Sequence, residues 1–83
     1  MKIISIMFIL VLSIFASVDI NIATAEEFTA IKGVGAKKAY AIVQYRKSIK
    51  CFKNINQLAE VKGISNSIIS KNIDNLKASP CNK

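Results

Sequence analysis

The sequence predicts a small all-α domain that is built from two similar helix–turn–helix units. Two segments thirty positions apart, Lys32-Gly33-Val34-Gly35 and Lys62-Gly63-Ile64-Ser65, share the order lysine, glycine, apolar residue, small residue. Apolar residues recur at helical spacing on both sides of each segment, which is the pattern of an internal repeat of short helices. The chain has 83 residues, enough for one domain at most.

The first 17 residues have the pattern of a secretory signal peptide. Lys2 precedes an apolar run that extends from Ile3 to Val18, and this run is shorter than the about 20 residues of a membrane-spanning helix. We expect cleavage after Ser17, with cleavage after Ala25 as the alternative, and a domain over residues 18–83. An uncleaved segment that anchors the chain to the inner membrane is the other interpretation.

A first helix, about 25–31, is predicted by a capping box. Thr24 is a suitable N-cap, and Glu27 stands three residues later. Phe28 and Ile31 fall on one face of this helix, so we expect both side chains in the core.

A second helix, about 36–48, carries Ala39, Ile42 and Val43 at core spacing. Its end is rich in basic residues, which suit the negative end of a helix dipole. These residues are Arg46, Lys47 and Lys50.

A third helix, about 55–61, follows Asn54, which can cap it, and places Leu58 and Val61 on its apolar face. A fourth helix, about 66–73, carries apolar residues at core spacing, namely Ile68, Ile69 and Ile73. Val18–Ile22 has the only strand-like alternation, and we expect this stretch to be too short to make a sheet.

The charge of the chain favours an anionic partner. The formal net charge is +7, and from Gly33 onward the only acidic residues are Glu60 and Asp74. Nucleic acid, anionic lipid and acidic proteins are the partner classes that such a field attracts. A lysine-rich surface that is merely solvated is the alternative interpretation.

Cys51 and Cys81 are the only cysteines, and both lie in the part of the chain expected to be exported. An even number of cysteines in a small exported protein favours one disulfide, with free thiols as the alternative. The chain has no histidine and five acidic residues, which argues against a metal site and against catalysis. We expect no cofactor, no small-molecule substrate and no enzymatic activity.

The two glycine turns are the candidate functional sites. In the first turn, Gly33 can adopt a conformation closed to other residues, Val34 can point to the core, and Gly35 lets a phosphate approach the backbone. Unpaired N–H groups open the following helix, where an anion would offset the unfavourable charges of Lys37 and Lys38. The predicted phosphate-contacting residues are Lys32, Gly33, Val34, Gly35, Ala36, Lys37 and Lys38 in the first turn, and Lys62, Gly63, Ile64, Ser65 and Lys71 in the second.

These motifs together resemble the tandem helix-hairpin-helix domain of ComEA-type competence proteins, which has a SAM-like fold, over about residues 19–77. The resemblance rests on Ile20-Asn21-Ile22-Ala23-Thr24-Ala25-Glu26-Glu27-Phe28, Ile31-Lys32-Gly33-Val34-Gly35, Lys38-Ala39, Ile42-Val43, Tyr45-Arg46, Phe52 and Val61-Lys62-Gly63-Ile64.

The resemblance implies an exported, periplasmic protein that binds double-stranded DNA without sequence specificity during uptake for natural transformation. The DNA-uptake channel or pilus machinery would be a further partner. An exported helix-hairpin-helix domain that docks on another protein is the alternative function.

The chain departs from the family pattern at Ala23, Cys51 and Ser65. Ser65 stands where the family usually has the glycine that ends the second hairpin. We therefore expect the first hairpin to be the principal grip on DNA and the second to support it. Phosphate contacts carry no base code, and about four to six such contacts are available near the turns.

Overall fold

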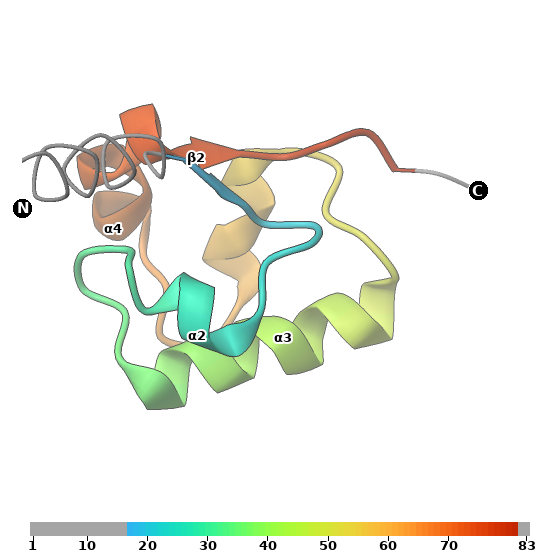
Figure 1. Ribbon diagram of the computed structural model, residues 1–83, viewed down its shortest axis with the longest axis horizontal. Coiled ribbons are helices and arrows are strands. Elements are labelled where there is room, and N and C mark those ends of the chain that lie inside the picture. The colour runs from blue at the N-terminus through green and yellow to red at the C-terminus, as the bar shows by residue number, and fades with distance from the viewer. Residues whose placement is uncertain (1–16, 82–83) are drawn as a thin grey trace, which may run out of the picture.

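The computed structural model describes residues 17–81, so the predicted signal peptide lies outside the described residues except for Ser17. Short helices dominate the fold, which confirms the predicted helical class (Figure 1). The elements in order are β1 (Val18–Asp19), α2 (Ala25–Phe28), α3 (Ala36–Ile49), the 3₁₀ helix η1 (Ile55–Glu60), α4 (Asn66–Lys71), the 3₁₀ helix η2 (Ile73–Asn75) and β2 (Leu76–Lys77).

The two strands form a small parallel sheet that joins the two ends of the domain. Val18 lies opposite Leu76 and Asp19 lies opposite Lys77, and the Ile20 N–H donates to the Lys77 carbonyl at 2.9 Å. The prediction that this stretch is too short to make a sheet was wrong. Its partner comes from the far end of the sequence, and side-chain bonds extend the short ladder.

Side chains of the N-terminal segment reinforce this junction. The Asn21 amide donates to the carbonyls of Phe52 at 2.9 Å and Ser79 at 2.7 Å, and accepts from the Phe52 N–H at 2.6 Å. The Asp19 carboxylate accepts from the N–H groups of Asn21 at 3.0 Å and Ser79 at 3.2 Å. Burial acts to raise the pKa of Asp19, but these bonds outweigh it and the pKa lies below its ordinary value of 3.8.

The caps of the helices follow the sequence. The Glu27 N–H donates to Thr24 Oγ1 at 3.1 Å and the Thr24 N–H donates to Glu27 Oε1 at 2.9 Å, so the predicted capping box is confirmed. Asn54 Oδ1 accepts from the Gln57 N–H at 3.1 Å at the start of η1. Two helices nevertheless differ from the prediction: α2 is shorter and ends at Phe28, and η1 is a tighter 3₁₀ helix.

The fourth helix also ends early. It stops at Lys71, and the Asn72 N–H closes its last turn on the Ile69 carbonyl at 3.1 Å. Ile73 lies beyond the helix and is 49% exposed. Its predicted place in the core was therefore wrong, because the helix ends at Lys71 although the apolar spacing of the sequence continues to Ile73.

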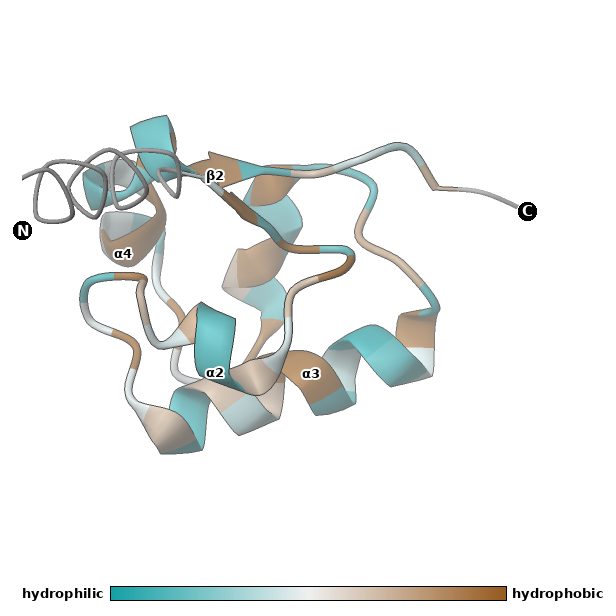
Figure 2. Cartoon of the chain, viewed as in Figure 1, coloured by the Kyte–Doolittle hydropathy of each residue, from teal (hydrophilic) through white to brown (hydrophobic). Residues whose placement is uncertain are grey.

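One hydrophobic core unites the elements. The apolar faces of α3 and α4 alternate with hydrophilic surface, as the hydropathy colouring shows (Figure 2). Phe28 is fully buried, as predicted, and Phe52 is fully buried in the same core. The other buried apolar residues are Ile20, Ala23, Ile31, Val34, Ala39, Ile42, Leu58, Val61, Ile64, Ile69 and Leu76.

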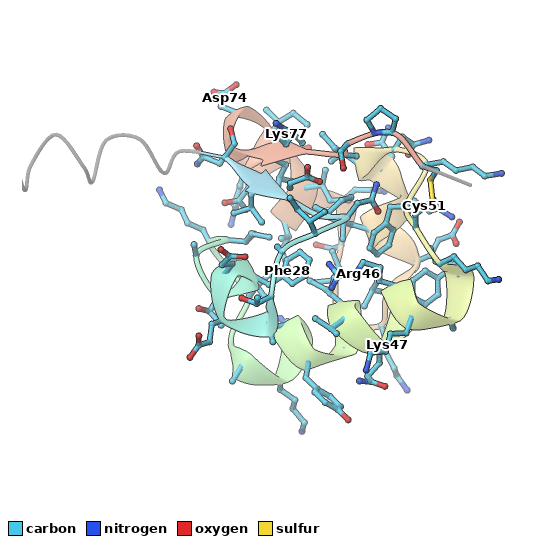
Figure 3. The ribbon with its side chains drawn as sticks, turned by 45° about the vertical axis from the view of Figure 1, so that its right-hand side comes forward. Phe28, Arg46, Lys47, Cys51, Asp74 and Lys77 are labelled. Atoms are coloured by element: carbon cyan, nitrogen blue, oxygen red, sulfur yellow. A yellow bond between two sulfur atoms is a disulfide. The ribbon has the colours of Figure 1, made fainter. Side chains whose placement is uncertain are left out.

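Arg46 ties α3 to the N-terminal segment instead of pointing along the helix axis. Its guanidinium donates to the carbonyls of Ile20 at 3.0 Å and Ala23 at 2.9 Å, and it lies 5.7 Å from the centroid of the Phe28 ring. In Figure 3, Arg46 points inward toward Phe28, whereas Lys47 points away from the domain.

The predicted disulfide joins Cys51, just after α3, to Cys81 in the C-terminal segment, with 5.9 Å between their Cα atoms (Figure 3). Near it, the Tyr45 ring stacks on Phe52 with 5.9 Å between centroids. The Tyr45 hydroxyl donates to Glu60 at 2.6 Å, and this bond raises the pKa of Tyr45. Among residues 17–81, no helix is long and apolar enough to cross a membrane.

Candidate nucleic-acid interface

The two glycine turns have nearly the same backbone geometry. Gly33 and Gly63 both have φ +95°, in the left-handed region where a side chain would be strained. The Val34 N–H donates to the Ile31 carbonyl at 3.0 Å, and the equivalent bond from Ile64 to Val61 is also 3.0 Å. The repeat in the sequence is thus a repeat of two hairpin turns, and both glycines are required by geometry.

Apolar residues on both sides hold each turn against the core. Ile31 and Val34 flank the first turn, Val61 and Ile64 flank the second, and all four side chains are buried. Val34 and Ile64 belong to the predicted site, but their buried side chains anchor the turns. Their backbone N–H groups close the turns, so these two residues support the site from within and do not present a free donor to a ligand.

The residues that follow the turns differ between the two hairpins. Gly35 caps α3 without any side-chain hydrogen bond, whereas Ser65 Oγ accepts from the Ile68 N–H at 3.3 Å at the start of α4. The helix after the first turn, α3, is also longer than the helix after the second, α4, with 14 residues against 6. The N-terminus of α3 therefore presents backbone N–H groups that no capping side chain covers, at the positive end of a longer dipole.

Gly35 lies where a side chain would fit without obstruction. A Cβ built on Gly35 meets no atom within 4 Å, and its φ of −94° is open to any residue. By contrast, a Cβ on Gly33 would lie 3.3 Å from Cγ1 of Ile68. Neither the backbone conformation nor the packing explains the absence of a side chain at Gly35. The residue is exposed, so its backbone is open to solvent.

The two hairpins pack on each other in a reciprocal way. Ile68 of α4 lies against Gly33, and Lys38 of α3, thirty positions earlier, lies with its methylene stem against Gly63, where a Cβ built on Gly63 would be 3.4–3.7 Å from the carbons of that stem. The Lys38 ammonium then reaches back to the Gly33 carbonyl at 3.4 Å. Each turn is thus covered by the helix of the other unit.

A groove of about 310 Å³ lies between the start of α3 and the second turn. It brings together three of the predicted lysines from two hairpins, and it is lined by Lys37, Lys38, Ala41, Lys62 and Gly63. The remaining predicted lysines, Lys32 and Lys71, are exposed and do not line this groove.

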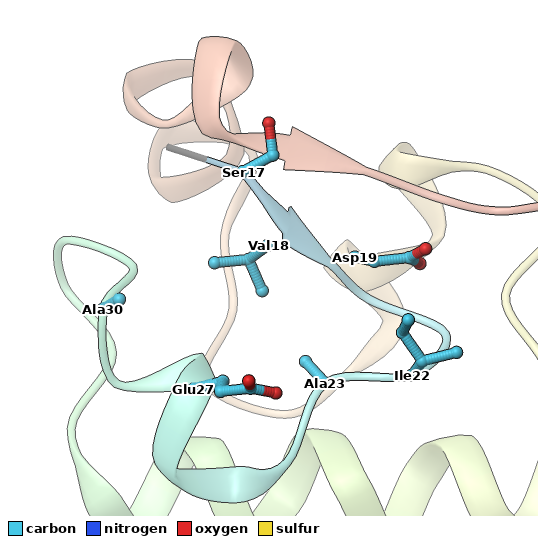
Figure 4. Close-up of a pocket in the computed structure, with 7 residues that line it drawn as sticks. All are labelled: Ser17, Val18, Asp19, Ile22, Ala23, Glu27 and Ala30. Atoms are coloured by element: carbon cyan, nitrogen blue, oxygen red, sulfur yellow. The ribbon is translucent and has the colours of Figure 1, made fainter. Parts of the chain in front are cut away.

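A second cavity, of about 220 Å³, lies between β1 and α2 and has a different chemistry (Figure 4). Its charged lining residues are Asp19 and Glu27, and both carboxylates already accept hydrogen bonds from within the domain. None of the described residues that line it is basic, and their carboxylates make this lining unsuited to an anion. Residues 17–81 contain no group of three or more side chains that could hold a metal ion.

One residue at the first turn was not predicted. Asn72 is buried, with 1% of its surface exposed, and its side chain bonds to the backbone of Lys32. The repeat could have indicated that Asn72 is buried, because the equivalent position thirty residues earlier is the core residue Ile42. A polar residue at a core position of a repeat needs hydrogen-bond partners.

Comparison with known proteins agrees with this geometry. The model of the helix-hairpin-helix motif family matches residues 14–77. An uncharacterized protein of Haemophilus influenzae is 49% identical over 59 residues, which cover 70% of this chain and 53% of that protein. The ComE operon protein 1 of Bacillus subtilis is 43% identical over 56 residues, which cover 68% of this chain and 27% of that protein.

The chain thus spans about half the length of the first of these relatives and about a quarter of the second. No solved structure matches it. The resemblance to ComEA-type proteins that the sequence indicated is confirmed by the second relative. With the family match over more than half of its residues and the paired hairpin turns described above, this chain belongs to the helix-hairpin-helix family.

Proposed function

We propose that this chain binds double-stranded DNA through the phosphate backbone, without sequence preference, and that it does so outside the cytoplasmic membrane during DNA uptake for natural transformation. Gly35 carries this proposal. Its lack of a side chain is required neither by φ nor by packing, but it leaves room for a phosphate at the start of a long helix, where uncapped N–H groups favour an anion.

The surrounding charge supports a polyanionic ligand. Lys37 and Lys38 stand in the first turn of α3, where cations are unfavourable for the helix itself. Lys62 of the other hairpin lies beside them across the groove. A phosphate backbone would neutralise all three ammonium groups, and the released counterions would favour binding.

Duplex DNA fits the surface better than a single strand. Tyr40, with 63% of its surface exposed, is the only large exposed aromatic residue in the part of the chain that the structure describes. Proteins that bind single strands stack successive bases on several aromatic side chains. Backbone N–H groups and lysines contact phosphates, which carry no sequence information.

The place of this activity is inferred from the chain's relatives and its N-terminus. The resemblance to ComEA-type competence proteins supports a binding role in DNA uptake, with the uptake channel or pilus machinery as partner. The apolar N-terminal run supports export to the periplasm. A disulfide is typical of an oxidising compartment and is consistent with this location.

A mobility-shift assay tests the proposal. The protein is mixed with two unrelated duplexes of equal length at two salt concentrations. We expect equal binding to both duplexes and a steep loss of affinity at the higher salt. No binding at low salt would contradict the proposal, and a strong preference for one duplex would contradict the backbone mechanism.

Two variants locate the contact. Gly35→Glu places a carboxylate in the open space at the α3 N-terminus, and we expect it to abolish binding while helical content stays unchanged. Gln44→Glu adds the same charge at an exposed position farther along α3, and we expect it to have a much smaller effect. Equal losses in the two variants would mean that overall charge, and not the first turn, governs binding.

A further inference from the structure

We propose that Asn72 is a positioning residue for the first hairpin, through which the second helix–turn–helix unit sets the DNA-binding conformation of the first turn. The inference deepens the proposed function and rests on it. Asn72 follows α4 and is forty positions from the turn that it contacts. Its side chain touches no DNA in this proposal and acts through the backbone of Lys32.

The hydrogen bonds of Asn72 use its whole side-chain amide. Oδ1 accepts from the Lys32 N–H at 3.0 Å, and Nδ2 donates to the Lys32 carbonyl at 3.1 Å and to the Ile68 carbonyl at 2.7 Å. The orientation of the amide follows from these partners, because an N–H needs an acceptor and the carbonyls need donors. With 1% of the residue exposed, no water replaces these bonds at the surface.

These bonds fix the backbone on both sides of one residue. The N–H of Lys32 belongs to the peptide unit before its Cα, and the carbonyl belongs to the peptide unit after it. Because each peptide unit is planar, holding both units holds φ and ψ of Lys32. Lys32 is the residue immediately before Gly33, so Asn72 fixes the entry into the turn that leads to Gly35 and the α3 N-terminus.

We call the paired hydrogen bonds between the Asn72 side chain and the Lys32 backbone the clamp, and the second hairpin has no equivalent. At the equivalent position, thirty residues before Asn72, stands Ile42, which is fully buried and has no polar atom in its side chain. In the described part of the chain, no side chain bonds to the Lys62 backbone; the stem of Lys38 covers Gly63 just as Ile68 covers Gly33. The clamp is therefore specific to the hairpin that keeps both glycines.

Removal of the clamp should loosen the first turn before DNA binds. The complex would then have to order that backbone, at a cost that we expect to weaken binding by about tenfold. If the loosened turn loses one phosphate contact, the slope of log affinity against log salt should become shallower by about 0.9.

The test uses the full protein with Asn72→Ala and Asn72→Ile. The first variant leaves space for water, and the second introduces the residue of the other unit, so failure of one to fold leaves the other for measurement. Two controls accompany them. Asn75→Ala removes an exposed asparagine three residues on, and Ile69→Val trims the core of α4 but keeps the clamp.

Two readouts are measured for each variant. The first is the hydrogen exchange of the Lys32 amide without DNA, which we expect to become faster in both Asn72 variants and to stay slow in both controls. The second is duplex affinity as a function of salt, which should show the tenfold loss and shallower slope in the Asn72 variants only.

The outcomes separate this inference from the proposed function. An unchanged Lys32 exchange rate, or wild-type affinity and slope in a folded Asn72 variant, would overturn the inference alone. An equal loss in Ile69→Val would also overturn it, because stability and not the clamp would then govern binding. Failure of the unaltered protein to bind any duplex would overturn the proposed function.

Discussion

The two hairpins of this domain share one turn but not the residues around it. Both turns have a glycine at φ +95°, buried apolar flanks and the same closing hydrogen bond. They differ at equivalent positions where the turn geometry does not fix the residue type. These pairs are Gly35 and Ser65, Lys38 and Ile68, and Ile42 and Asn72.

This difference separates what the fold requires from what it allows. A residue other than glycine at Gly33 or Gly63 would strain the backbone in either hairpin. Ser65 shows that the position of Gly35 accepts a side chain, because it has a similar backbone conformation and caps its helix. The first hairpin therefore lacks a cap that the second has, and the phosphate contact that we propose at Gly35 would account for that difference.

Charge reversal should have the largest effect on duplex affinity, and the loss should differ between the two hairpins. We expect Lys37→Glu/Lys38→Glu to weaken duplex binding by at least about a hundredfold at low salt, and Lys62→Glu/Lys71→Glu by about tenfold. Both double variants change the net charge equally, so each is the control for the other. Equal losses in a mobility shift would show that neither hairpin is the principal grip.

The disulfide should affect stability and not the binding site, because Cys51 follows the C-terminal end of α3 and the first turn precedes its N-terminal end. We expect Cys51→Ser/Cys81→Ser to lower the free energy of unfolding by about 2–4 kcal/mol, measured by urea denaturation. At a temperature where the variant remains folded, its affinity for DNA should match that of the oxidised protein. A selective loss of binding would place the disulfide in the functional site.

Acid should weaken the junction of the two chain ends without acting on either turn. Because the pKa of Asp19 is lower in the folded state than its ordinary value, its stabilisation is present above about pH 4 and is lost as the pH falls through the folded pKa. We expect Asp19→Asn to cost about 1 kcal/mol at pH 7, since it removes a charged acceptor of several hydrogen bonds.

Thermal unfolding between pH 7 and pH 3 checks this expectation. The stability difference between the unaltered protein and Asp19→Asn should shrink as the pH falls. Asp74→Asn is the matched control, because Asp74 is exposed. A difference that persists unchanged at pH 3 would show that the Asp19 charge contributes nothing.

An exchange of the two N-cap residues should have the smallest effect. Gly35→Ser should raise stability by a few tenths of a kcal/mol, because it adds a cap, and Ser65→Gly should lower it by a similar amount. Duplex affinity should fall about threefold in Gly35→Ser, since serine still permits a fairly close approach to the backbone. Tighter binding by Gly35→Ser would contradict the assigned role of the open glycine.

Local rules predicted much of this fold. The capping box at Thr24, the turn glycines and the buried Phe28 all follow from residue types at fixed spacing, and the structure confirms them. The alternation over Val18–Ile22 indicated a strand, but the sheet was rejected because the stretch is short and its partner, Leu76–Lys77, lies at the other end of the sequence. Ile73 was misplaced because apolar spacing cannot show where a helix ends.

The candidate site was predicted in outline from the repeat. The spacing of glycines and lysines located both turns, but it could not show that Lys38 covers Gly63 or that Asn72 holds Lys32. Those contacts join one unit to the other, and only the packing of the two units creates them. The pairing of Lys37 and Lys38 with Lys62 in one groove has the same origin.

The most direct measurement of the central claim follows backbone amide resonances while an unrelated duplex is titrated into the protein. The account predicts the largest shift changes at Gly35, Ala36 and Lys37, smaller changes at Ser65, and little change near Cys51. If the largest changes fell outside the first hairpin, or were equal in the two hairpins, the claim that the open α3 N-terminus is the principal phosphate site would be contradicted.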